Sequence, residues 1–229
     1  MKLAIVIPVY NEAKVIREVI NSIPKKIKGV DKIEIIAVND GSTDNSEEEI
    51  KKTRAILLNH AVNLGVGAST TTGLEAAKMI KTDIALTLDG DGQHDPRDIK
   101  RIVTPLIKKK ADLVIGTRLK NPAGMSLYKK IGNLGLNTVT FLLSGKWSSD
   151  TQSGFKGLSK NALNKLSFET LGYEFCSEII INASQKKLKI IEVPIKVIYN
   201  DYSRKKGQSI FNGVNIIAKL IYKKLTRNT

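Results

Sequence analysis

The chain has 229 residues, of which 41% are hydrophobic and 5% aromatic, and it carries a formal net charge of +15. This size predicts one large α/β domain with a substantial core, and the lone cysteine, Cys176, excludes an internal disulfide framework and favours a reducing compartment. No stretch reaches the ~20 apolar residues of a transmembrane helix, and the short apolar run at the N-terminus predicts a strand rather than a signal peptide.

The positive charge is concentrated in the second half of the chain. Residues 1–115 hold 18 Lys and Arg against 16 Asp and Glu, whereas residues 116–229 hold 19 against 6. This asymmetry predicts a polyanionic partner, such as a membrane surface or a phosphorylated substrate. A lysine-rich proteome is the alternative explanation, but it accounts poorly for the missing acids. A nucleic-acid-binding module is disfavoured, because aromatic residues are too few for a base-stacking platform.

Apolar, strand-like runs alternate with helix-period segments along the first half of the chain. This alternation predicts a parallel sheet covered by helices on both faces. The expected strands lie at 3–7, 33–38, 55–58, 84–88 and 112–115, and the expected helices at about 12–23, 44–53, 66–80 and 97–109.

A polar or glycine-rich turn follows each expected strand. The carboxyl ends of parallel strands meet at one edge of a sheet, so these five turns predict a nucleotide site there. A Rossmann dinucleotide site and a P-loop are excluded, because the sequence contains neither glycine signature. The glycine-rich N-terminal signature of nucleotidyltransferases is also absent.

The turn after the fourth strand reads Asp-Gly-Asp-Gly-Gln-His-Asp-Pro, at residues 89–96. Asp89, Asp91 and Gln93 offer hard oxygen ligands on one short loop, a set that suits Mg²⁺ or Mn²⁺ shared with a substrate diphosphate. A solvated Asp-Gly turn is the alternative. We expect His94 to be a structural neighbour rather than a ligand, and Asp95 to cap the next helix.

The motifs together resemble those of family 2 glycosyltransferases with the GT-A fold, and most of all the polyprenyl-phosphate (dolichyl-phosphate) sugar transferases such as dolichol-phosphate mannose synthase. The resemblance implies a mostly parallel α/β sheet in one domain over 1–229, with a nucleotide-sugar half (1–118) and an acceptor- and membrane-facing half (119–229). It is carried by IPVYNE at 7–12, VNDGSTD at 38–44, NLGVGA at 63–68, LDGDGQHDP at 88–96, GTR at 116–118, DTQSGFKG at 150–157, EVPI at 192–195 and R-x-x-G-x-S at 204–209.

The resemblance also implies a set of donor-site residues. Tyr10 is expected to pack against the nucleobase and Asp40 to accept hydrogen bonds from it, while Asn39 stands where the family usually has an acid. Mg²⁺ or Mn²⁺ would be held by Asp89, Asp91 and Gln93. The full nucleotide-sugar set is Pro8, Tyr10, Asn11, Glu12, Asn39, Asp40, Gly67, Asp89, Gly90, Asp91 and Gln93.

On the acceptor side, the resemblance implies that Arg118 binds the acceptor phosphate, with Lys129 or Lys130 and Arg204 as further cations. Asp91, Arg118 and Asp150 are the expected catalytic residues. Asp150 stands where other family 2 members place a base, and here we expect it to orient sugar or acceptor; a purely structural turn aspartate is the alternative. A phosphate monoester is largely dianionic at neutral pH and needs no strong base.

The implied reaction is metal-dependent, inverting transfer of a hexose to dolichyl or polyprenyl phosphate for glycan assembly. The donor would be GDP-mannose, UDP-glucose or UDP-N-acetylglucosamine, and a saccharide acceptor is the alternative. Amphipathic segments at 128–143 and 210–225 predict peripheral contact with an anionic membrane, on its cytoplasmic face, or else ordinary packing on the sheet. Glu174 and Glu178, one helical turn apart, are expected to face the same cleft or to lie on a solvated face.

Overall fold

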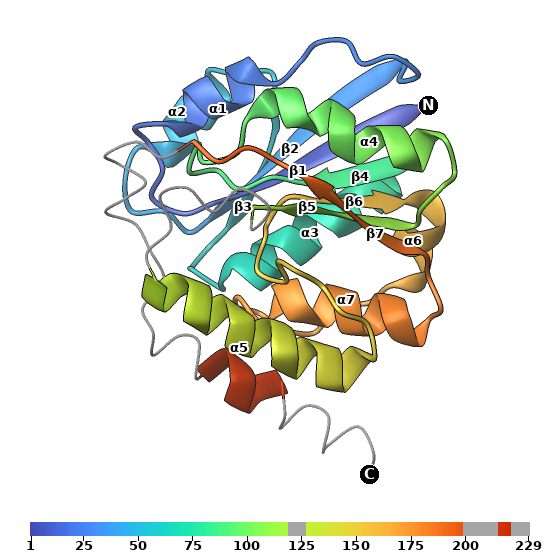
Figure 1. The fold of residues 1–229 in the computed structure, drawn as a ribbon. Helices are drawn as coiled ribbons and strands as arrows, with labels where there is room; N and C mark the ends of the chain where they lie inside the picture. The colour runs from blue at the N-terminus through green and yellow to red at the C-terminus, as the bar shows by residue number, and fades with distance from the viewer. Residues whose placement is uncertain (119–126, 199–214, 221–229) are drawn as a thin grey trace.

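The computed structural model describes residues 1–118, 127–198 and 215–220. A mixed, seven-stranded sheet in the order β3-β2-β1-β4-β6-β5-β7 forms the centre of this part (Figure 1). Strand β6 runs antiparallel to its neighbours β4 and β5, and the other pairs are parallel. The strands are β1 (Lys2–Val9), β2 (Lys32–Asp40), β3 (Ile56–His60), β4 (Ile84–Thr87), β5 (Leu113–Thr117), β6 (Lys156–Ser159) and β7 (Ile190–Pro194).

Strand β1 lies deep in the middle of the sheet. Its run from Leu3 to Ile7 has no exposed side chain, and it pairs in parallel with β2 on one side and β4 on the other. A strand covered on both faces needs a continuous apolar run rather than an alternating one, and this explains the composition of β1.

Helices cover both faces of the sheet, as the sequence predicts. Helices α1 (Ile16–Ser22), α2 (Ser46–Lys51) and α4 (Ile99–Ile107) contribute to one hydrophobic core. Helices α3 (Val66–Met79), α6 (Lys160–Lys165) and α7 (Phe175–Gln185) contribute to the core on the opposite face.

Helix α5 (Leu127–Ser144) lies outside α7, at the periphery of the molecule (Figure 1). Its Leu136 shares a small apolar cluster with Ile216 and Leu220 of a helical turn at residues 215–220. The rest of the helix expected over 210–225 lies outside the described residues. Among the helices of the described ranges, none combines the length and apolar character needed to cross a membrane.

The five expected strands and four expected helices are all present, with shifted ends. The first helix begins at Ile16 rather than near residue 12, because the turn after β1 continues through residue 15. Asp95 accepts a hydrogen bond from the backbone N–H of Arg97 at 2.9 Å, so the predicted cap is confirmed. It caps a short 3₁₀ turn, η1 (Pro96–Asp98), which leads into α4.

Candidate active site

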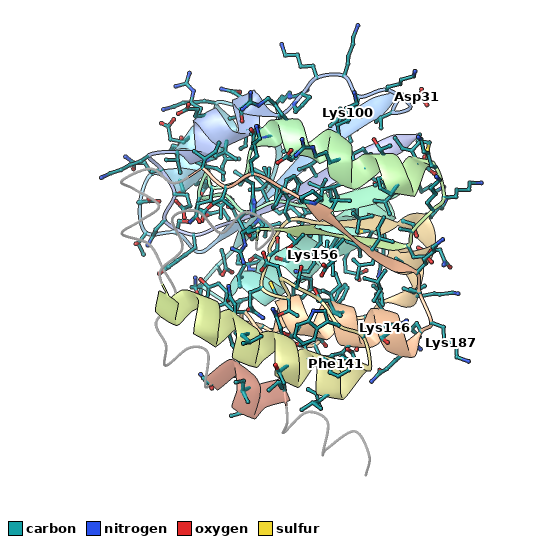
Figure 2. The ribbon with its side chains drawn as sticks, in the orientation of Figure 1. Asp31, Lys100, Phe141, Lys146, Lys156 and Lys187 are labelled. Atoms are coloured by element: carbon teal, nitrogen blue, oxygen red, sulfur yellow. The ribbon has the colours of Figure 1, made fainter. Side chains whose placement is uncertain are left out.

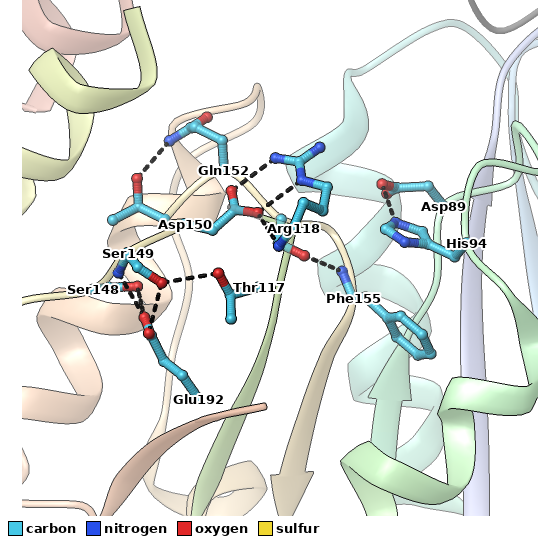
Figure 3. Close-up of polar contacts among 12 residues, drawn as sticks. Asp89, His94, Thr117, Arg118, Ser148, Ser149, Asp150, Gln152, Phe155 and Glu192 are labelled. Carbon is cyan, nitrogen blue, oxygen red and sulfur yellow. Dashed lines mark hydrogen bonds and ion pairs between the residues drawn. The ribbon is translucent and has the colours of Figure 1, made fainter. Parts of the chain in front are cut away.

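Six segments converge at the carboxyl edge of the parallel strands. The turns after β1, β2, β3, β4 and β5 all lie at this edge, and they carry Tyr10, Asp40, Gly65, Asp89 and Arg118. Because β6 is antiparallel, the chain enters it from the same edge, so the segment 148–155 joins the five turns (Figure 3). The predicted gathering of motifs is confirmed, with one more segment than parallel topology alone would bring.

The turn after β1 is tied to the turn after β2. The side chain of Asn11 accepts a hydrogen bond from the Thr43 N–H at 2.8 Å, and the Asn11 N–H donates to Ser42 Oγ at 3.0 Å. Tyr10 beside them is 45% exposed, and the Pro8 carbonyl lies close to Gly90 of the aspartate loop. An exposed ring beside this braced turn suits base packing, and that role stays a prediction.

Asn39 and Asp40 are buried and brace the end of β2. The Asp40 carboxylate accepts hydrogen bonds from the N–H groups of Leu64 and Gly65 at 3.1 and 2.8 Å, and it lies 2.7 Å from His60 Nδ1. Asn39 accepts a hydrogen bond from the turn that follows it. Both residues therefore shape the loop from inside, and direct contact with a base stays a prediction.

Gly67 packs closely against the segment before α7. Its N–H donates to the Leu171 carbonyl at 2.7 Å, and a β-carbon at position 67 would lie 2.5 Å from the Thr170 carbonyl oxygen. The glycine is required by this close approach. A contact of Gly67 with the nucleotide stays a prediction.

Glu174 and Glu178 are buried, so the solvated helix face considered for them is wrong. Glu178 accepts hydrogen bonds from the N–H groups of Glu169 and Thr170, each at 3.1 Å. Glu174 accepts from Lys219 Nζ at 3.2 Å. The two carboxylates therefore brace neighbouring backbone and the helical turn at 215–220, and their facing a common cleft stays a prediction.

The aspartate loop holds two carboxylates of unlike character. Asp89 Oδ2 lies 2.9 Å from His94 Nε2, whereas Asp91 accepts hydrogen bonds from the backbone and side-chain nitrogens of Gln93 at 2.9 and 2.6 Å. Burial raises the pKa of Asp91, and the charge of Asp89 raises it further. For Asp89, burial acts to raise the pKa, but the His94 hydrogen bond and the nearby cations leave it lowered.

A divalent cation fits these two carboxylates. Their mutual repulsion would be relieved by a bound cation, and carboxylate oxygens are ligands that Mg²⁺ and Mn²⁺ prefer. Over the residues that the structure describes, no three His, Cys, Asp or Glu side chains form a complete metal cage. Asp89 and Asp91 therefore suit a cation that takes its other ligands from water and substrate phosphates. Gln93 uses its amide nitrogen for Asp91, and its role as a ligand stays a prediction.

Arg118 and Asp150 form a two-pronged ion pair (Figure 3). Arg118 donates from Nε to Oδ2 at 2.7 Å, from Nη2 to Oδ1 at 2.8 Å and from its backbone N–H to Oδ2 at 2.9 Å. Burial acts to raise the pKa of the fully buried Asp150, but Arg118 outweighs this effect and lowers it. Asp150 is thus held ionised and paired, and the group that it orients directly in this structure is Arg118.

Sequence reasoning missed Glu192 of β7, although it lies in the recognised EVPI motif. Glu192 Oε1 accepts hydrogen bonds from Ser148 Oγ and from the Ser149 N–H, each at 2.7 Å. Its Oε2 accepts from Ser149 Oγ at 2.7 Å, and that hydroxyl lies 2.8 Å from Thr117 Oγ1. Glu192 therefore holds together the two segments whose next residues are Arg118 and Asp150.

Lys156 and Gly154 of the DTQSGFKG motif were also missed. Lys156 is almost fully buried in the middle of the molecule, whereas Lys100 and Lys187 lie at its surface (Figure 2). Its ammonium donates to the carbonyls of Thr151 and Ser153, and so fixes the segment after Asp150. The DTQSGFKG motif was the sequence signal that could have identified these two residues, but only its aspartate has a side chain with an evident chemical role.

The remaining predicted acceptor cations are not described by the structure. Lys129 and Lys130 lie in α5, but their side chains lie outside the described part, as does the whole of Arg204.

Comparison with known proteins agrees with the motifs. The model of glycosyl transferase family 2 matches residues 4–167. A UDP-N-acetylglucosamine–dolichyl-phosphate N-acetylglucosaminyltransferase from Methanococcus voltae is 41% identical, over 96% of this chain and 95% of that protein. A dolichol-phosphate mannosyltransferase from Pyrococcus furiosus is 26% identical, over 96% of this chain and 64% of that protein.

Among solved structures, glucosyl-3-phosphoglycerate synthase from Mycobacterium tuberculosis, in complex with Mn²⁺ and UDP-glucose, is similar with a TM-score of 0.73. The match covers 99% of this chain and 78% of that one at 22% identity, so it shows the shared fold. The same enzyme has also been solved with Mg²⁺ and UDP. The resemblance expected from the motifs is confirmed, and the chain belongs to glycosyl transferase family 2.

Proposed function

We propose that this glycosyltransferase moves N-acetylglucosamine from UDP-N-acetylglucosamine to dolichyl or another polyprenyl phosphate. The choice of donor follows the relative that is 41% identical along nearly the whole of both chains. The observation that carries the proposal is the pairing, at one sheet edge, of the Asp89–Asp91 loop with the Arg118 guanidinium (Figure 3). The Asp89–Asp91 loop, with a bound cation, suits a nucleoside diphosphate, and the Arg118 guanidinium suits a phosphate acceptor.

The donor would be bound by the first 118 residues. Tyr10 packs against the base, and the Asn11–Glu12 and Asn39–Asp40 turns surround the nucleoside. Asp89 and Asp91, with Gln93, would hold Mg²⁺ or Mn²⁺ against the diphosphate. Such a cation, when bound, stabilises the charge that grows on the leaving nucleoside diphosphate.

The acceptor phosphate would be bound by Arg118, whose planar guanidinium makes paired, charge-assisted hydrogen bonds to phosphate. Asp150 fixes the plane of that guanidinium, and Lys129 or Lys130 and Arg204 add positive charge. The dianionic phosphate oxygen attacks the anomeric carbon as its bond to the diphosphate breaks, which inverts the configuration. No base has to remove a proton, so the residues act by positioning and charge neutralisation.

Helix α5 supports a peripheral membrane position for the acceptor half, residues 119–229. Its exposed side chains include Leu134, Phe141 and Leu142, the last 70% exposed, and Trp147 just after the helix is exposed too. Its buried face carries the polar Asn137 and Thr140 beside the apolar Leu136. A helix whose exposed face carries several large apolar side chains suits contact with lipid more than with water. We place this face on the cytoplasmic side of an anionic membrane.

The test is an assay of the purified full chain with short-chain polyprenyl phosphate and three donors: UDP-N-acetylglucosamine, UDP-glucose and GDP-mannose. Mn²⁺ or Mg²⁺ is present and is then removed by EDTA. We expect N-acetylglucosamine on the lipid phosphate, with loss of turnover in EDTA. Transfer from another nucleotide sugar would overturn the donor assignment, and donor hydrolysis without lipid product would favour a saccharide acceptor.

A matched pair of variants tests the acceptor role of Arg118. Arg118→Ala should raise the KM for lipid phosphate at least tenfold, because a charge-assisted pair is lost. Arg97→Ala is the control, since Arg97 is 84% exposed and pairs with Asp95 rather than with Asp150. Equal effects of the two substitutions would contradict the proposed role.

A further inference from the structure

Asn137 is a buried polar residue on the inner face of α5. Its side chain points toward the segment that precedes β6, from which it accepts and to which it donates hydrogen bonds. Burying an amide is costly unless its polar atoms are paired. Here both the amide nitrogen and the carbonyl oxygen of Asn137 are hydrogen-bonded, so its surroundings satisfy the buried amide.

The hydrogen bonds of Asn137 flank Asp150 on both sides. Asn137 Nδ2 donates to the Ser149 carbonyl at 2.8 Å, and Asn137 Oδ1 accepts from the Thr151 N–H at 3.1 Å and from Thr151 Oγ1 at 2.8 Å. A single side chain therefore fixes the residue before and the residue after Asp150. This contact sets the direction in which the Asp150 side chain leaves the backbone.

Asp150 in turn fixes Arg118, through two side-chain hydrogen bonds and one from the Arg118 backbone N–H. A shift of the segment 149–151 must therefore move or break three hydrogen bonds to Arg118. Hydrogen bonds therefore connect Asn137 of α5 to the backbone on either side of Asp150, and Asp150 to the Arg118 guanidinium.

We infer that Asn137 is a positioning residue that couples the seating of helix α5 to the orientation of Arg118. The inference rests on the proposed function, in which Arg118 binds the lipid phosphate and the outer face of α5 meets the membrane. It adds that the two are coupled. If α5 were displaced from its packed position, the Arg118 guanidinium would be misoriented, while the donor site would stay intact.

Asn137→Leu removes the three hydrogen bonds with little change in side-chain volume. Asn182→Leu on α7 is the matched control, because Asn182 is also a buried asparagine that donates to a loop carbonyl, that of Ser167, at 2.8 Å. We expect Asn137→Leu to raise the KM for polyprenyl phosphate on the order of tenfold, because misplacement of a binding group is costly. The KM for the nucleotide sugar should stay within about twofold of wild type in both variants.

A second measurement, amide hydrogen exchange, does not depend on catalysis. The Arg118 N–H donates to Asp150, so its exchange rate reports whether the coupling reaches Arg118. We expect Asn137→Leu to accelerate exchange at both Thr151 and Arg118, and Asn182→Leu to accelerate neither. If Asn137→Leu does not fold, Asn137→Asp replaces it, because aspartate keeps the acceptor for Thr151 and loses the donor to Ser149.

The outcomes separate the inference from the function on which it rests. If the wild-type enzyme places no sugar on lipid phosphate, the proposed function fails, and exchange at Arg118 still decides the coupling. Unchanged exchange at Arg118 in the Asn137 variant would overturn the inference. Equal losses of donor and acceptor affinity in the Asn137 and Asn182 variants would also overturn it, because that is the result of a general loss of stability.

Discussion

The backbone of Gly154 lies directly against the carboxylate of Asp89. A β-carbon at position 154 would fall 2.0 Å from Asp89 Oδ1, closer than any real contact. The segment is held in place because Thr87 Oγ1 donates to the Gly154 carbonyl at 2.6 Å. Gly154 thus determines how Asp89 sits at the edge of the sheet.

Gly154→Ala should therefore displace the Asp89 carboxylate. We expect turnover to fall on the order of tenfold or more, with a higher Mn²⁺ concentration needed for half-maximal rate and a nearly unchanged circular dichroism spectrum. Gly135→Ala is the control, because a β-carbon there meets no atom within 4 Å. Wild-type metal dependence in Gly154→Ala would show that the position of Asp89 is unimportant.

Asp91→Asn should abolish metal-dependent turnover while leaving the fold stable. Removing the charge relieves repulsion from Asp89, which helps to raise the pKa of Asp91, so the melting temperature should not fall. Asp31→Asn is a suitable control, because that side chain is 89% exposed. Turnover and thermal melting are measured with Mn²⁺ and with EDTA. Full activity of the wild-type enzyme in EDTA would show that the reaction does not require the cation.

Asp150→Asn should destabilise the enzyme in a pH-dependent way. Because Arg118 lowers the folded-state pKa of Asp150, the pair stabilises the protein fully above the unfolded carboxylate pKa of about 3.9. That stability is lost as the pH falls through the lower folded pKa. We expect wild type to be more stable than the variant by a few kcal/mol at pH 7, since one partner of a buried pair is neutralised.

Urea unfolding of both proteins across acid and neutral pH measures this difference. The difference in unfolding free energy between wild type and variant should be constant from pH 8 to about pH 5, and it should become smaller only below about pH 4. A difference that is equally large in strong acid would show that the ionised pair does not supply the stability.

Glu192→Ala and Glu192→Gln should differ sharply in their stability and in their KM for the acceptor. Glutamine retains an oxygen that can accept from Ser148 and the Ser149 N–H, and its amide can donate to Ser149 Oγ. Alanine leaves these groups unpaired and should cost about 1–3 kcal/mol of stability. Acceptor KM and urea midpoints are measured for both. Equal behaviour of the two variants would mean that the hydrogen bonds are unimportant.

The sequence was sufficient to predict features with a local signal. The apolar run of β1 identified a strand, the alternation of strands and helices identified a sheet covered on both faces, and the Asp89–Asp91 turn with its capped helix identified the loop at the sheet edge. The family motifs identified the remaining turns. These signals depend on neighbouring residues, so they can be read along the chain.

The features that were missed depend on contacts between distant residues. Arg118 and Asp150 are 32 positions apart, and no spacing rule predicts that they pair. Strand β6 has only four residues, one of them a glycine, and it was not predicted. Gly157 is needed there because a β-carbon would lie 2.6 Å from Ile102 Cγ2. Asn137 was part of a segment, 128–143, that was assigned by its mixture of basic and apolar residues, in which an individual asparagine carries no signal.

The antiparallel insertion of β6 between β4 and β5 has a consequence for protein engineering. Strands β4 and β5 carry the aspartate loop and Arg118, and both come from the first half of the chain, yet the strand that joins them comes from the second. A fragment ending at residue 118 would leave these strands without the partner between them. Acceptor specificity therefore cannot be exchanged between relatives by a simple cut at this point: a working chimaera has to transplant β6 together with both of its neighbours.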